Sequence, residues 1–165
     1  MQLYWNKMTQ MKFHLVYMGM HYHRSVVIER WINIILAVIS TGSLAGLFIS
    51  PSTQKIWACL LVFAQVLTSA KPYLPFSKRV QDLDKGIAAL EVVYEDCERE
   101  WVDFSEGKIT ESEARIAIYK YEKKWNSIDA SILKEDSLPR NEKLIKIADI
   151  EKNRYFENVF GGNNE

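Results

Sequence analysis

The feature that most constrains this chain is the apolar stretch at residues 31–70, in which Lys55 is the only charged residue. Residues 31–50 read WINIILAVISTGSLAGLFIS, and as an α-helix they would rise about 30 Å, the thickness of the hydrocarbon core of a bilayer. A helix-breaking segment around Pro51 follows, and residues 56–70, IWACLLVFAQVLTSA, would rise about 22 Å. The pattern predicts an all-α membrane protein with a two-helix transmembrane hairpin at residues 31–76. Two buried helices of a soluble core are the alternative, and whether the short second segment crosses fully stays open.

Basic residues beside the hairpin indicate its orientation. The loop between the two apolar segments contains Lys55 alone, whereas the flanks carry Lys7, Lys12, Arg24, Arg30, Lys71, Lys78 and Arg79. Because segments rich in Lys and Arg remain on the cytoplasmic side of a membrane, we expect both termini in the cytoplasm and the loop outside. The first apolar segment begins only at residue 31 and a second one follows it, which is not typical of a secretory signal peptide.

Residues 77–160 have the spacing of a cytoplasmic helical module. Apolar residues recur at alternating intervals of three and four in two runs, which are Val80, Leu83, Ile87, Leu90, Tyr94, Cys97, Trp101 and Phe104, then Ala114, Ile118, Tyr121, Trp125, Ile128 and Ile132. Residues 105–108 interrupt the pattern, and Thr110 with Glu113 forms a capping box. The two runs therefore predict an antiparallel helical hairpin. Asn141 can cap a third helix, and residues 161–165 are predicted to be a disordered tail.

The N-terminal arm, residues 1–30, is also amphipathic. Its apolar positions have the same alternating spacing and are Tyr4, Met8, Met11, Leu15, Met18 and Tyr22. Two placements satisfy this stripe: the arm packs on the helical hairpin of the cytoplasmic module, or it lies on the membrane surface, which its basic flank favours. The sequence leaves both open.

The polar residues do not form a recognisable catalytic or metal site. His21 and His23 are two residues apart, which places them on different sides of a helix, and we interpret them with His14 as part of a solvated basic flank. Cys59 and Cys97 are too few for a disulfide framework or a zinc site. Five carboxylates flank the apolar stripe of the first cytoplasmic helix and are interpreted as its solvent-facing side: Glu95, Asp96, Glu98, Glu100 and Asp103.

Charge and motifs exclude further classes. No phosphate-binding loop, serine nucleophile elbow, zinc-protease or dinucleotide motif occurs, so we predict that the chain is not an enzyme and holds no cofactor or metal. Residues 1–76 contain six basic residues and one acid, whereas residues 77–165 contain 15 basic and 20 acidic residues. The acidic balance of the second part argues against general nucleic-acid binding.

Two groups of residues are candidate functional positions. In the apolar hairpin, small and polar residues either seat one helix on the other or line contacts between protomers and a wet path, and they are Gly42, Ser43, Gly46, Gln65, Thr68 and Ser69. In the cytoplasmic module, the candidate positions for oligomerisation or partner binding are the stripe residues Leu83, Ile87, Leu90, Tyr94, Trp101, Ile118, Tyr121 and Trp125.

The order of these segments resembles the SLATT family of two-transmembrane effectors. The resemblance rests on an arm with KFHLVY and HYHR, the apolar segment WINIILAVISTGSLAGLF, a second segment ending in AKPYLPFSKR, and long helices after it. It implies a bacterial inner-membrane effector of anti-phage defence that forms a homo-oligomer and permeabilises the lipid bilayer. A partner sensor encoded nearby, a nucleotidyltransferase or a reverse transcriptase, would supply the trigger. A membrane-anchored scaffold whose helical hairpin docks a partner protein is the alternative.

Overall fold

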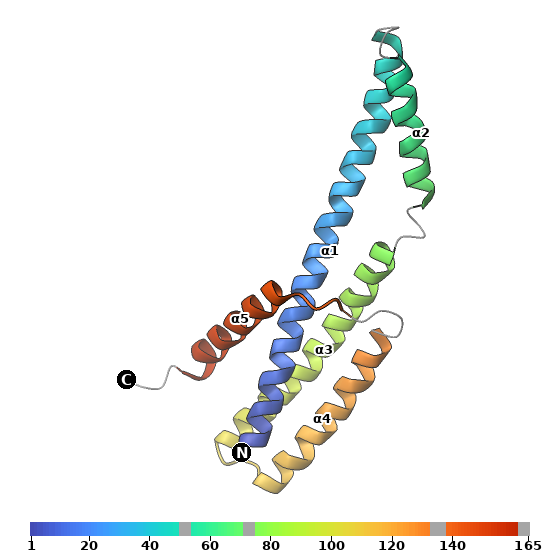
Figure 1. The fold of residues 1–165 in the computed structure, drawn as a ribbon. Helices are drawn as coiled ribbons and strands as arrows, with labels where there is room; N and C mark the ends of the chain where they lie inside the picture. Colours follow the sequence, from blue (N-terminus) through green and yellow to red (C-terminus); the bar gives the residue numbers. More distant parts are fainter. Residues whose placement is uncertain (50–53, 71–74, 133–137, 162–165) are drawn as a thin grey trace. The chain divides into compact units, whose positions relative to one another are not determined.

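The computed structural model describes residues 1–49, 54–70, 75–132 and 138–161, and for residues 42–49, 54 and 75–79 it describes the backbone only. The described part of the chain contains five helices and no strand: α1 (Gln2–Ile49), α2 (Gln54–Ala70), α3 (Pro75–Ser105), α4 (Glu111–Ile132) and α5 (Glu142–Phe160) (Figure 1). The predicted all-α class is confirmed. Of the predicted tail at residues 161–165, Gly161 is the C-cap of α5, and residues 162–165 lie outside the described residues.

The chain divides into two compact units, and α1 runs through both. Unit 1 consists of residues Met1–Tyr22 and Asp82–Glu165, and unit 2 consists of His23–Gln81. The N-terminal arm and the first apolar segment, predicted as separate parts, are one helix of 48 residues. No proline lies between residues 2 and 49 to break its hydrogen-bond ladder, which explains why it continues.

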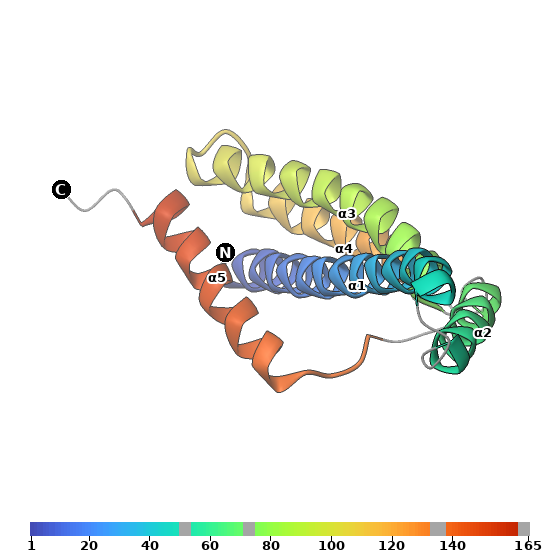
Figure 2. The same cartoon turned by 90° about the horizontal axis from the view of Figure 1, so that it is seen from above.

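In unit 1 the arm packs on the helical hairpin, which is the first of the two placements left open by the sequence. Each of its stripe residues is buried or half-buried, and Tyr4 donates a hydrogen bond of 2.8 Å to the backbone carbonyl of Cys97 in α3. Figure 1 shows α4 and α5 on opposite sides of the pair formed by α1 and α3, and Figure 2 shows α5 crossing α1 at an angle. Among the described residues, the largest fully buried side chains are Met8, Met18, Leu83, Leu90, Val93, Cys97 and Ile118.

The predicted caps form at the first turns of α4 and α5. The Thr110 N–H donates to Glu113 Oε2 at 2.8 Å, and the Glu113 N–H donates to Thr110 Oγ1 at 3.3 Å, so the capping box is confirmed. Asn141 Oδ1 accepts from the N–H groups of Lys143 and Leu144 at the start of α5, as predicted. Gly107, with φ of 75°, makes the turn between α3 and α4 in a conformation that only glycine adopts readily.

Unit 2 consists of the second part of α1, all of α2 and the start of α3. Among its described side chains, Leu36 and Ala64 are buried, whereas the large apolar side chains Trp31, Val38, Ile56 and Val62 are between 59% and 65% exposed. None of the helices, searched over the residues that the structure describes, combines the length and the apolarity that crossing a membrane requires.

Candidate functional site

A polar concavity of unit 1 is bordered by α1, α3 and α5. Its volume is about 410 Å³. Apolar side chains form part of its wall, and the polar groups that line it are Lys12, Glu91, Tyr94, Glu95, Glu98 and Tyr155. We name it the acidic groove, because three carboxylates and one ammonium group give it a formal charge of −2.

Lys12, Glu98 and Tyr155 form the centre of the acidic groove. Lys12 Nζ lies 3.4 Å from the ring centroid of Tyr155 and 4.7 Å from that of Tyr94, which is cation–π geometry. The Tyr155 hydroxyl donates to both carboxylate oxygens of Glu98, at 2.8 and 2.9 Å. One side chain from each of three helices therefore meets here, and the contacts tie α5 to α1 and α3.

Burial favours the neutral forms of Lys12 and Tyr155 in the groove. Desolvation lowers the pKa of Lys12, and the attraction of Glu98, Glu91 and Glu95 offsets part of this effect. Burial, followed by the hydrogen bond to Glu98, raises the pKa of Tyr155 to about 12. The phenol therefore stays protonated and keeps donating throughout the neutral range.

A second set of polar contacts joins the arm to α4. Lys7 pairs with Glu122, and His14 Nε2 lies 3.1 Å from Asp129 Oδ1, with all four side chains half-buried. On the α3 side of α4, the Tyr121 hydroxyl donates to Glu100 Oε2 at 2.6 Å. These pairs occur at spacings of one helical turn or more along α1 and α4, so they set the register in which the arm packs.

Two sequence interpretations of polar residues need correction. Glu98 and Glu100 were expected to face solvent with their neighbours, but both are half-buried acceptors for tyrosine hydroxyls. His21 is buried and His14 half-buried, so only His23 of the three histidines lies on a solvated flank. The reason is the same in both cases: helices from elsewhere in the chain cover the sides of α1 and α3 that a single amphipathic helix would leave exposed.

The stripe residues predicted for oligomerisation or partner binding lie inside unit 1. Ile87 and Tyr121 are half-buried, and the other six are buried, namely Leu83, Leu90, Tyr94, Trp101, Ile118 and Trp125. They belong to the core of the chain's own bundle or pack against it, and two of them, Ile87 and Tyr94, also line the acidic groove.

The candidate residues of the apolar hairpin are described only in α2. Gln65, Thr68 and Ser69 are exposed, and the Thr68 hydroxyl donates to the backbone carbonyl of Ala64 at 2.8 Å, a bond within its own helix. Gly42, Ser43 and Gly46 belong to α1, but their side-chain environments lie outside the described residues. All three described members of this group therefore lie on one helix, α2.

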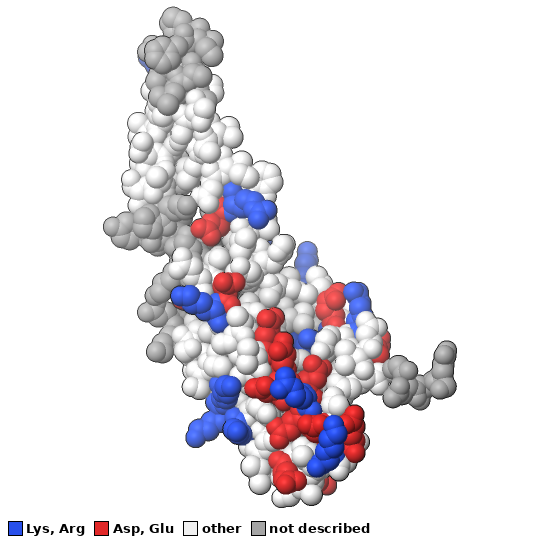
Figure 3. All heavy atoms as spheres, turned by 180° about the vertical axis from the view of Figure 1, so that it is seen from behind, with Lys and Arg blue, Asp and Glu red and all other residues white. Residues whose placement is uncertain are grey.

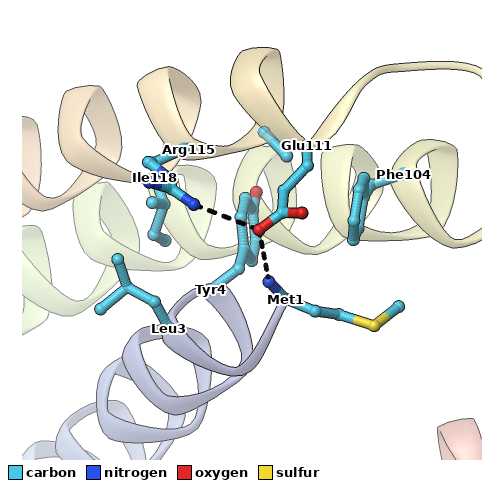
Figure 4. A pocket seen from close by; sticks show the side chains of 8 residues that line it. Met1, Leu3, Tyr4, Phe104, Glu111, Arg115 and Ile118 are labelled. Carbon is cyan, nitrogen blue, oxygen red and sulfur yellow. Dashed lines mark hydrogen bonds and ion pairs between the residues drawn. The ribbon is translucent and has the colours of Figure 1, made fainter.

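A smaller pocket lies where the start of α1 meets the end of α3 and the start of α4 (Figure 4). Its volume is about 30 Å³, room for roughly one water molecule. Glu111 Oε1 accepts from the amino group of Met1 at 3.3 Å and from Arg115 at 3.2 Å (Figure 4). These cations, the amino group foremost, lower the pKa of Glu111. The pocket is too small for a ligand, and we interpret it as a packing feature.

The described residues include no group of three His, Cys, Asp or Glu side chains that could hold a metal ion. Cys59 is exposed, whereas Cys97 is buried, and burial raises the pKa of its thiol to about 11. A thiol with so high a pKa is a poor nucleophile at neutral pH, so Cys97 acts as a core residue.

Sequence reasoning missed the acidic groove. Lys12 directly follows the stripe residue Met11, and Glu98 directly follows Cys97, so each lies at the edge of an apolar stripe. A charged residue at such an edge is a signal for partial burial, but the residues that cover it come from α5, which the periodicity of α1 and α3 does not reveal.

Comparison with known proteins gives no match of any kind. No family model, no curated protein and no solved structure matches this chain. The resemblance to SLATT effectors therefore stays a prediction, and a function must be argued from the geometry of the two units.

Proposed function

We propose that the apolar hairpin of unit 2 inserts into a lipid bilayer, and that the protein is an effector that assembles there and permeabilises the membrane when a partner sensor signals. The observation that carries the proposal is the outer surface of unit 2. Eight large apolar side chains on α1 and α2 are at least 44% exposed: Trp31, Ile34, Ile35, Val38, Ile56, Val62, Phe63 and Val66.

A surface of this kind is unfavourable in water. Helices on the surface of soluble proteins turn a polar side outward, whereas these two pack one apolar side together and expose another. The described part of the hairpin carries no charge between Trp31 and Thr41, and Lys55 is the only charged residue of α2. Such an outer surface is stable in the hydrocarbon core of a lipid bilayer.

The lengths of the helices bear on how the hairpin inserts. The 17 residues of α2 rise about 25 Å, short of the roughly 30 Å of a bilayer core. Local thinning of the bilayer and a Lys55 side chain that reaches the interface would accommodate this mismatch.

The test uses the full chain in phospholipid vesicles loaded with a fluorescent dye, with and without the products of neighbouring genes. We expect the wild-type protein to float with the vesicles and to release the dye once triggered. Replacing both glycines, with Gly42→Leu and Gly46→Leu, should abolish release without reducing flotation, because Leu inserts at least as well as Gly but keeps helix backbones apart.

A matched control carries two substitutions at the same spacing on another side of the helix, Ala37→Leu with Thr41→Leu, where both wild-type residues are exposed. This variant should release dye as the wild type does. Release that persists in the glycine variant removes the glycines from the mechanism. A wild-type protein that floats with vesicles, binds its partner and never releases dye supports instead a membrane-anchored scaffold, for which the acidic groove is the candidate docking surface.

The orientation of the proposed hairpin has its own test. In a Cys59→Ser background, Ser52→Cys should react with a membrane-impermeant maleimide added to intact cells, whereas Ser77→Cys should react only after the cells are opened. The reverse order would place the helical module outside and away from any cytoplasmic sensor.

A further inference from the structure

The outer side of α4 is a basic and apolar surface that the described part of the chain leaves exposed. Ile116 is 68% exposed and Tyr119 is 54% exposed, although both are large and apolar. Lys120 and Lys123 lie beside them, one helical turn away from Ile116 and Tyr119 respectively, and are exposed as well. In the part of the chain that the structure describes, the α4 residues that form ion pairs are Glu111, Arg115, Glu122 and Asp129, and not Lys120 or Lys123.

The acidic groove is complementary to this surface in charge and in character. Glu91 and Glu95 are exposed at its rim, and apolar side chains and two tyrosine rings line its wall. The groove carries a formal charge of −2, and Lys120 with Lys123 supplies +2. A volume of about 410 Å³ admits side chains such as Ile116 and Tyr119, since pockets of about 300 Å³ or more hold whole small ligands.

The two surfaces of one molecule cannot meet each other. The groove lies between α1 and α3 on the side where α5 packs, and α4 lies on the opposite side of the α1–α3 pair (Figure 1). Figure 3 shows acidic side chains gathered over α3, with some basic side chains among them and others beside them over α4. Complementary surfaces on different sides of one molecule produce a head-to-tail contact between copies.

We propose that copies of this chain assemble head to tail through unit 1, with the outer side of α4 in one copy seated in the acidic groove of the next. The inference deepens the proposed function, in which the protein must assemble, by naming the interface. A head-to-tail contact repeats from copy to copy, so it builds rings or open chains rather than a closed dimer. Docking in the groove also brings the next copy into contact with Tyr155 of α5, so the assembly depends on where α5 packs.

The test uses two full-length variants with reversed charges, purified separately in detergent. The first is Lys120→Glu with Lys123→Glu, and the second is Glu91→Lys with Glu95→Lys. All four residues are exposed, so both variants should fold, which circular dichroism checks. Sedimentation velocity should show that the wild type assembles and that each variant alone associates at least about tenfold more weakly.

The mixture of the two variants is the decisive sample. The first variant has an acidic α4 and an acidic groove, and the second has a basic α4 and a basic groove. Every contact between unlike copies therefore pairs opposite charges, and an equimolar mixture should recover the wild-type assembly as an alternating chain or ring. The matched control, Lys143→Glu with Lys146→Glu on the exposed side of α5, should assemble as the wild type does.

A cross-linking measurement checks the contact directly. In a Cys59→Ser background, a Tyr119→Cys copy mixed with a Glu91→Cys copy should form a covalent dimer with a short bifunctional maleimide, and Tyr119→Cys copies alone should not. A mixture of the charge variants that stays monomeric, or variants that assemble alone, overturns the proposal, and so does a wild type that is monomeric in detergent and in vesicles. Dye release by a protein that fails these tests leaves the proposed function standing, and assembly without dye release removes the proposed function instead.

Discussion

At the scale of single residues, Glu98 shows how the fold makes use of a charge near its core. The carboxylate accepts from Tyr155 at 2.8 and 2.9 Å and lies 3.4 Å from the Tyr94 hydroxyl. A half-buried carboxylate without such donors would weaken the bundle, because the cost of removing it from water would not be recovered. The hydrogen bonds to Glu98 therefore stabilise the position of α5 on α3.

Removing the Tyr155 hydroxyl tests this contribution. We expect Tyr155→Phe to lower the free energy of unfolding by about 1 to 2 kcal/mol, the range for a hydrogen bond to a charged acceptor that is partly solvated. Urea unfolding followed by tryptophan fluorescence measures it, since Trp5, Trp101 and Trp125 lie in unit 1. Tyr119→Phe is the control, because that ring is exposed and should change stability by less than about 0.5 kcal/mol. Equal effects of the two substitutions would show that the bond to Glu98 contributes nothing.

At the scale of elements, Gly86 allows α3 and α4 to approach closely. It is buried, and a Cβ atom added to it would clash with Cδ1 and Cγ1 of Ile132 near the end of α4. Gly19 in α1 presents the opposite case, because a Cβ atom there would meet nothing within 4 Å. Both glycines lie inside helices, so the difference between them is whether a side chain of a neighbouring helix packs against the position.

The two glycines predict opposite effects of the same substitution. Gly86→Ala should destabilise the protein by about 1 to 3 kcal/mol, because Ile132 must leave its position in the interface. Gly19→Ala should be neutral or stabilising by up to about 1 kcal/mol, since Ala is the better helix former. Denaturant unfolding of both variants, and of Gly86→Ala combined with Ile132→Ala, gives the coupling energy. A double variant whose loss equals the sum of the single losses would show that the close approach is not what Gly86 provides.

At the scale of the whole molecule, unit 1 encloses four tyrosines whose pKa values are raised, Tyr4, Tyr94, Tyr121 and Tyr155. Burial is the largest cause for each of them. The folded chain therefore keeps protons that the unfolded chain releases near pH 10. The resulting stability is complete below that pH and is lost as the pH rises toward the pKa values of the folded state.

We expect the midpoint of thermal unfolding to stay level up to about pH 9 and to fall steeply above pH 10. Lys12 acts in the other direction, because its pKa is lowered on folding, but one lysine does not offset four tyrosines. Circular dichroism at several pH values, with tyrosinate absorbance recorded in parallel, measures the effect. The variant Tyr121→Phe with Tyr155→Phe should show a shallower fall, and a midpoint as pH-dependent as that of the wild type would assign the loss to other groups.

Local patterns in the sequence were sufficient for the helices of unit 1. The intervals of three and four place apolar residues on one side of a helix whatever surrounds it, and the predicted stripes are the ones that form the core. The two caps were predictable because each is local. Thr110 and Glu113 are three residues apart, and Asn141 Oδ1 accepts from a backbone N–H group three residues later.

What only the tertiary structure decided is which surfaces meet. An apolar stripe indicates that one side of the arm is covered, but it does not indicate what covers it. The same pattern is therefore expected whether the arm packs on α3 and α4 or lies on a membrane. Glu98 and Glu100 were misinterpreted because the tyrosines that bind them are 57 and 21 residues away in the sequence. The acidic groove depends on where α5 crosses α1 and α3, and that position follows from contacts between distant residues, which no periodicity within one helix encodes.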